Sequence, residues 1–135
     1  MIKTAPIIFT IAIVLVLFSC KSGAKIQDGE TAYQYKKYLL AADLLQKDFS
    51  KAKTTQEQTK IALKIADSYD KQLDYANAES WYKKMADLRV QNDAVFLYLN
   101  ALKRNEKYQE ALSYLDTYLK ANKSEKFRLQ KEYDF

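Results

Sequence analysis

The chain has 135 residues, which is enough for one domain, and it carries a formal net charge of +5. It contains no His and one Cys, so zinc sites, Cys–His nucleophiles and Ser–His–Asp triads each lack a required member. Lys and Arg are interspersed with Asp and Glu, whereas a nucleic-acid surface needs clustered basic residues. These features argue against an enzyme, and they predict no cofactor, no metal and no nucleic-acid partner.

Residues 1–19 have the three-part layout of a secretory signal peptide. Lys3 supplies the positive start, and an apolar run over residues 7–18 is interrupted only by Thr10. As a helix rising about 1.5 Å per residue, this run is too short for a hydrocarbon core of about 30 Å. We therefore expect a cleaved signal rather than a spanning anchor.

The end of the apolar run resembles the lipobox of bacterial lipoproteins, carried by Leu17, Ser19 and Cys20. The resemblance implies cleavage before Cys20 and acylation of its sulfur; a buried structural Cys or an ordinary signal peptide is the alternative. Residues 20–27 are mostly small, polar and basic, which favours a flexible tether. Lys21 follows Cys20 where inner-membrane lipoproteins often have Asp, and no acidic stretch follows. An outer-membrane protein facing the periplasm is therefore expected.

Residues 28–122 show helical apolar spacing and no alternating strand pattern. Thr54 and Glu57 are spaced as a capping box, and Asp74 and Asn92 are placed to cap two further helices. Turns are expected at residues 72–74 and 105–107, and a short helical piece at 30–36. The residues expected to face the core are Tyr38, Ala41, Leu44, Leu45, Phe49, Ile61, Ala62, Ile65, Ala66, Tyr69, Tyr75, Ala78, Trp81, Tyr82, Met85, Val95, Tyr98, Leu99, Leu102, Tyr108, Ala111, Leu115 and Tyr118.

Short turns between such helices predict an all-α fold of antiparallel helix pairs, since no single helix can bury its apolar stripe alone. Trp81 is expected in the core, with a half-exposed contact position as the alternative. The carboxylate pairs Asp67–Asp70 and Glu106–Glu110 lie on expected polar faces among lysines. Nothing there would desolvate them for acid–base catalysis.

The helix pairs repeat at a fixed period. Tyr75 and Tyr108 are 33 residues apart, as are Ala78 and Ala111. This pattern resembles the tetratricopeptide (TPR) family, whose repeat is about 34 residues. The positions that carry the match in the clearest repeat are Ile65, Ala66, Tyr69, Tyr75, Ala78 and Tyr82. Leu73 stands where the family usually has a turn Gly. The resemblance implies a short TPR-like α-solenoid.

By the same resemblance, the first helices of the pairs line a concave groove. Its mixed polar lining would suit an extended peptide or a partner helix. The groove residues implied are Lys60, Leu63, Asp67, Asp70, Lys71, Asp93, Phe96, Asn100, Lys103 and Arg104.

Residues 123–135 are expected to form a polar capping helix with Phe127 as its main apolar contact. The whole layout resembles the front of longer envelope lipoproteins, some associated with type IX secretion. In those proteins an OmpA-like domain provides a link to peptidoglycan, so the chain is either complete or the front of a longer protein.

The function expected from these resemblances is a scaffold that binds an envelope protein or peptide and contacts the membrane through lipid on Cys20. An accessory lipoprotein of outer-membrane barrel assembly and a peptide-binding carrier remain as alternatives.

Overall fold

The computed structural model describes residues 25–90 and 93–123, which form six α-helices and no strand. The all-α prediction is therefore confirmed, and none of the described helices is long and apolar enough to cross a membrane. The signal peptide, Cys20, most of the tether, the Asn92 cap and the capping helix after residue 123 lie outside the described residues. The helices are α2 (Gly29–Gln34), α3 (Tyr38–Lys51), α4 (Thr55–Asp70), α5 (Tyr75–Asp87), α6 (Asp93–Arg104) and α7 (Tyr108–Ala121).

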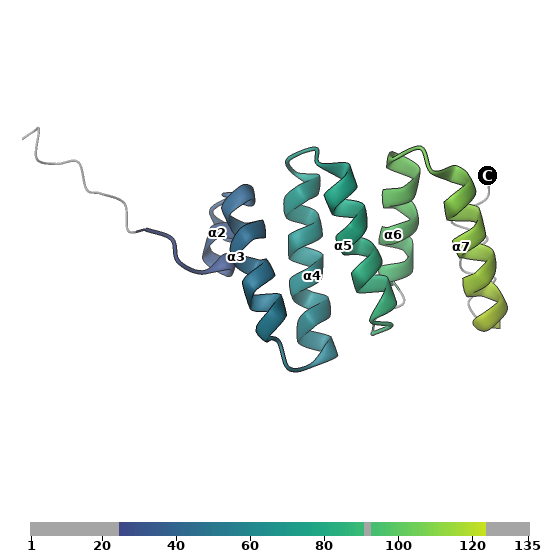
Figure 1. Ribbon diagram of the computed structural model, residues 1–135, viewed down its shortest axis with the longest axis horizontal. Coiled ribbons are helices and arrows are strands. Elements are labelled where there is room, and N and C mark those ends of the chain that lie inside the picture. Colours follow the sequence, from purple (N-terminus) through teal and green to yellow (C-terminus); the bar gives the residue numbers. More distant parts are fainter. Residues whose placement is uncertain (1–24, 91–92, 124–135) are drawn as a thin grey trace, which may run out of the picture.

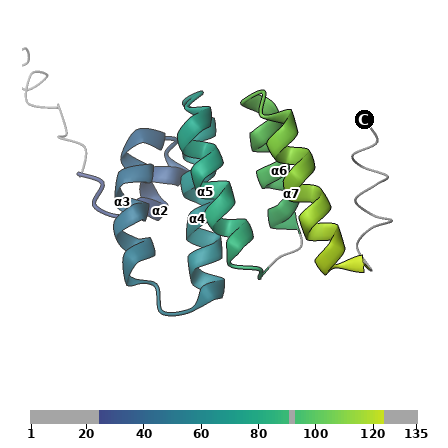
Figure 2. The same cartoon turned by 45° about the vertical axis from the view of Figure 1, so that its right-hand side comes forward.

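The helices stand in a row, each packed against the next in the chain (Figure 1). The same order is visible in the turned view of Figure 2. They run alternately up and down, so that the α4–α5 and α6–α7 turns share one edge of the array. Three helix pairs result, α2–α3, α4–α5 and α6–α7, stacked in a solenoid-like arrangement.

The turn inside each pair has the same backbone geometry. One residue per turn lies in the left-handed region, with φ of 57° at Lys36, 62° at Leu73 and 59° at Glu106. In the middle turn the Leu73 N–H donates to the Asp70 carbonyl at 3.0 Å, and the Asp74 N–H donates to the Tyr69 carbonyl at 3.0 Å. This is the Schellman pattern, which usually has Gly at the left-handed position. The chain builds all three turns with non-Gly residues.

The expected helix caps are largely present. The Thr54 hydroxyl accepts from the Glu57 N–H at 3.2 Å, and the Asp74 carboxylate accepts from the Asn77 N–H at 3.2 Å. The capping box departs in one detail, because the Glu57 carboxylate accepts from the Lys53 N–H rather than from the N–H of Thr54. These caps satisfy N–H groups that the first helical turn leaves without partners.

The core draws buried apolar side chains from all six helices. Ala66 on α4 and Ala78 on α5, both expected to face the core, are fully or almost fully buried. Trp81 is also in the core, where its ring meets Phe49 of the preceding pair edge-to-face, with centroids 5.1 Å apart. Small residues thus allow close helix pairs, and an aromatic contact joins one pair to the next.

Two expected core residues are at the edge of the array instead. Tyr75 is 37% exposed and Tyr108 is 53% exposed. Each is the first residue of its helix, directly after a turn. Side chains lean toward the N-terminus of their own helix, so these rings extend past the end of the helix that precedes the turn.

Candidate functional site

A depression of about 460 Å³ lies where α4, α5 and α6 meet. Its lining includes four of the residues expected in the groove: Asp70, Asn100, Lys103 and Arg104. Tyr82 and Leu97 complete it. Asp70 comes from the end of α4, whereas Asn100, Lys103 and Arg104 come from the second half of α6. The solenoid stacking therefore brings together groove residues that are separated by about one repeat in the sequence.

Asp70 is the fixed centre of this depression. Its Oδ2 lies 2.8 Å from Nη1 of Arg104 and accepts a 3.1 Å hydrogen bond from the Tyr82 hydroxyl. The Asp70 side chain is only 13% exposed, and its Oδ1 is buried with no described donor within reach. Burial, and then the charge and hydrogen bond of Asp70, raise the pKa of Tyr82 well above its usual value. Asp70 thus ties three helices together.

Arg104 is oriented from two directions. Besides its ion pair with Asp70, its guanidinium lies 5.8 Å from the centroid of the Tyr75 ring. The Arg104 side chain remains 42% exposed, and a guanidinium has five N–H donors, more than the pair with Asp70 uses. Asn100 is exposed beside it and can both donate and accept. Together these groups can bind carbonyl and carboxylate oxygens of a partner.

Asp67 and Lys71 belong to a second cluster, between α2 and α4. Asp67 Oδ2 accepts from the Tyr33 hydroxyl at 2.7 Å, and its Oδ1 lies 3.9 Å from Lys71 Nζ. Lys64 pairs with Glu30 between the same two helices. These carboxylates serve inter-helix contacts, so this cluster connects the first two helix pairs.

The other expected groove residues do not line the depression. Lys60 is exposed on α4, and Leu63 is half-buried against the core. Asp93 is exposed at the start of α6, whereas Phe96 is a core residue with 8% exposure. The depression therefore occupies the part of the expected groove near the α4–α5 turn and the end of α6.

Two features were not anticipated from the sequence. Tyr82 was expected only as a core residue, although a buried Tyr hydroxyl needs a hydrogen-bond partner. Glu79, 12% exposed at its side chain, lies 2.7 Å from Lys107 Nζ and also accepts from the Asn105 side chain. Asn105 in turn donates to the Tyr75 carbonyl at 3.0 Å. This network ties the α6–α7 turn to α5, and no sequence spacing identifies it.

A smaller depression of about 230 Å³ lies between α5, α6 and α7, with Tyr114, Tyr118 and Arg89 in its lining. None of the expected groove residues lines it. Within residues 25–90 and 93–123, no group of three or more His, Cys, Asp or Glu is arranged to hold a metal ion.

The chain matches no protein-family model, and no curated protein matches it. The TPR resemblance therefore remains a prediction from the residues that carry it.

Proposed function

We propose that the protein is a lipid-anchored helical-repeat scaffold that binds a segment of another envelope protein. The observation that carries the proposal is the depression between α4, α5 and α6, where an ion pair with Asp70 orients the exposed Arg104 beside Asn100. A donor that is already oriented loses less conformational entropy on binding, so it favours recognition of partner oxygens.

The character of the depression favours a protein segment over a small ligand. Small-molecule pockets are enclosed and mostly apolar, whereas this one is open to solvent and has charged and amide groups around Leu97. Such a surface suits an extended backbone with an acidic side chain. Lys103 adds positive charge beside the Asp70–Arg104 ion pair, and the Arg104 guanidinium keeps N–H donors that the pair with Asp70 does not use. Stacked helix pairs commonly present extended binding surfaces of this type.

We place the protein at the outer membrane because Leu17, Ser19 and Cys20 resemble a lipobox. Acylation of Cys20 would attach the array to the outer membrane, with Lys21 favouring that membrane, and the depression would face a partner in the periplasm. An envelope complex, such as a secretion assembly, is the setting we propose.

The test is site-specific photo-crosslinking in envelope membranes, with the full chain expressed from its own signal sequence. A photo-crosslinking amino acid at Leu97 should capture one protein, and Asn100→Glu in the same chain should abolish that product by repelling an acidic segment. Gln109→Glu makes a similar change on the exposed surface of α7, outside the depression, and should leave the product intact.

Circular dichroism of both variants establishes that the helices are retained. Equal crosslinking by the two variants would refute the depression as the binding site. Capture of the same set of proteins by a crosslinker at Leu97 and by one placed on α7 would refute it as well.

A further inference from the structure

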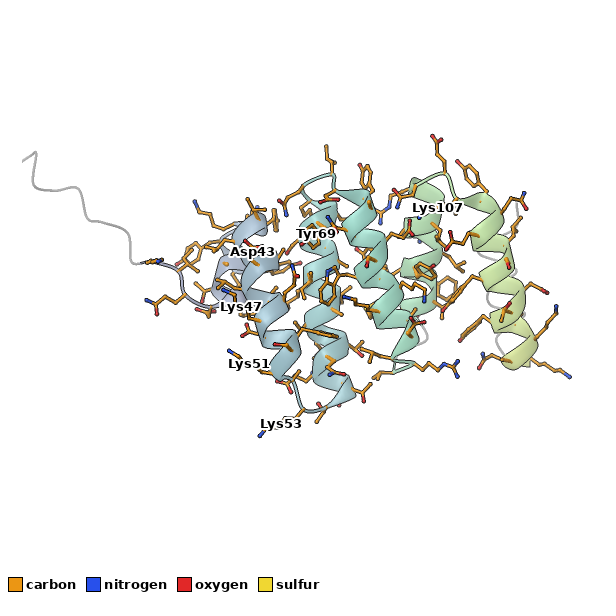
Figure 3. The ribbon with its side chains drawn as sticks, viewed as in Figure 1. Asp43, Lys47, Lys51, Lys53, Tyr69 and Lys107 are labelled. Atoms are coloured by element: carbon orange, nitrogen blue, oxygen red, sulfur yellow. The ribbon has the colours of Figure 1, made fainter. Side chains whose placement is uncertain are left out.

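Exposed apolar side chains gather at one edge of the array. In Figure 3, Asp43, Lys47, Lys51 and Lys53 follow α3 toward one edge, and Lys107 lies at the opposite edge, where the α6–α7 turn is. The α2–α3 turn precedes α3 and so lies toward the same edge as Lys107. The large apolar residues exposed around the three turns of this edge are Tyr35, Leu39, Leu40, Leu73, Tyr75, Tyr108 and Leu112; Val90 lies elsewhere.

The charges distinguish the first turn from the other two. Lys36 and Lys37 are exposed there, and neither forms an ion pair with any described residue. At the third turn Lys107 is neutralised by Glu79, and Glu106 adds a negative charge beside it. The second turn carries the acidic Asp74. Only the first of the three turns combines exposed apolar side chains with uncompensated positive charge.

We propose that this first turn, residues 35–40, docks onto acidic phospholipid headgroups and so orients the array on the membrane. Tyr35 is 69% exposed and Leu39 is 66% exposed, and such side chains lie favourably at a membrane interface. Lys36 and Lys37 between them would be attracted to an anionic surface. The proposal rests on the lipid anchor of the proposed function, because that anchor brings the turn to the membrane.

Chain length supports the placement. Lys25, the first described residue, follows Cys20 by so few residues that even a fully extended chain spans only about 18 Å. The first helix pair is therefore held near the bilayer surface, whereas the third pair lies at the far end of the row.

A second copy of the chain would fit the first turn less well than an acidic membrane does. Its surface would need free carboxylates to match Lys36 and Lys37. Beside the other two turns, Asp70 is bound to Arg104, Glu79 is bound to Lys107 and Asp74 caps α5. Among the described acidic residues of those two turns, Glu106 is left to face two lysines. Charge complementarity therefore favours the membrane.

The experiment uses the full chain, processed in cells and reconstituted through its own anchor. Tyr35→Cys and Tyr108→Cys provide matched reporters, since both replace exposed Tyr beside a turn. The rate of modification by a membrane-impermeant maleimide is compared in vesicles of phosphatidylcholine with phosphatidylglycerol, in phosphatidylcholine alone and in detergent. The position-35 thiol should react at least about fivefold more slowly in the acidic vesicles than in detergent, and the position-108 thiol at the same rate in all three.

Lys36→Glu with Lys37→Glu should remove the protection at position 35. The first change is compatible with the turn, because Glu106 already occupies the equivalent left-handed position in the third turn. Equal reactivity of the two thiols in every vesicle, or equal protection of both, would overturn the proposal.

The mass of the processed chain tests the anchor separately. A chain without acyl groups would contradict the proposed anchoring. With Cys20→Ser to remove the free thiol, that chain added from solution to the same vesicles would still decide the docking by the reactivity of the position-35 thiol.

Discussion

The Tyr33 hydroxyl on α2 donates a 2.7 Å hydrogen bond to Asp67 Oδ2 on α4, 34 residues further along the chain. It joins the first helices of two successive pairs, which no local contact could do. Burial, together with the hydrogen bond to Asp67, raises the pKa of Tyr33 to about 12. The short helix α2 is thereby tied to the array through a bond that the protonated phenol alone can donate.

Replacement of Tyr33 by Phe should lower the free energy of unfolding by about 1 kcal/mol, because it removes this hydrogen bond. Asp67 would then keep the 3.9 Å ion pair with Lys71. Urea denaturation followed by circular dichroism measures the change. Tyr35→Phe is the matched control, because the Tyr35 side chain is 69% exposed and should lose almost nothing. An equal effect of the two substitutions would show that the bond contributes no net stability.

Alkaline pH should weaken the fold through the same residue. The pKa of Tyr33 in the folded protein is raised from 10.0 to about 12. Below pH 10 the phenol is protonated in both states and its contribution is fully present. As the pH rises through 10 toward 12 the unfolded chain loses the proton first, so the free energy of unfolding falls.

Urea denaturation at several pH values in this range measures the effect, with Tyr33→Phe as the reference. The variant should lose less stability between pH 10 and pH 12 than the wild-type chain. Parallel curves for the two proteins would contradict a raised Tyr33 pKa.

Leu73→Gly should stabilise the protein by up to about 1 kcal/mol. Leu73 is 71% exposed and has a φ of 62°, a conformation that costs a non-Gly residue about 1–2 kcal/mol, more than the entropy Gly loses on folding. Leu112→Gly makes the same change inside α7 and should destabilise by about 1 kcal/mol. Thermal melts should show a higher midpoint temperature for Leu73→Gly and a lower one for Leu112→Gly. A lower midpoint for both variants would show that Leu73 is not strained in the α4–α5 turn.

Ala66→Leu should destabilise the protein by about 1–3 kcal/mol, because Ala66 is fully buried where α4 packs against its neighbours and a larger side chain would force them apart. Ala76→Leu places the same side chain on an exposed position of α5 and should change stability by less than about 0.5 kcal/mol. Urea denaturation separates the two cases. Tolerance of Leu at position 66 would mean that small size is not needed there.

Helix caps and most core positions could be predicted from the nearby sequence. Caps such as Thr54 and Asp74 act on N–H groups two or three residues away, so spacing alone identifies them. The prediction that Tyr75 and Tyr108 lie in the core was wrong. Apolar periodicity indicates which face of a helix is buried, but it does not show where the neighbouring helix ends.

The candidate site was only partly visible in the sequence. The resemblance to the TPR family implied Asp70, Asn100 and Arg104 as groove residues, and all three line the depression. That Asp70 binds Arg104 and Tyr82 could not be foreseen, since a carboxylate near several possible donors pairs according to distances that only the packing sets.

The sequence by itself determined that the chain between residues 29 and 121 forms short helices in the parts that the structure describes, that the helix pairs repeat, and that residues 17–20 resemble a lipobox. These features depend on local periodicity, capping and spacing. Only the tertiary structure decided which repeated positions meet, that Phe96 is in the core, and that Lys36 and Lys37 have no described ion-pair partner whereas Lys107 does. The physical reason is that pairing and burial depend on the stacking of one helix pair on the next, which joins residues about one repeat apart in the chain.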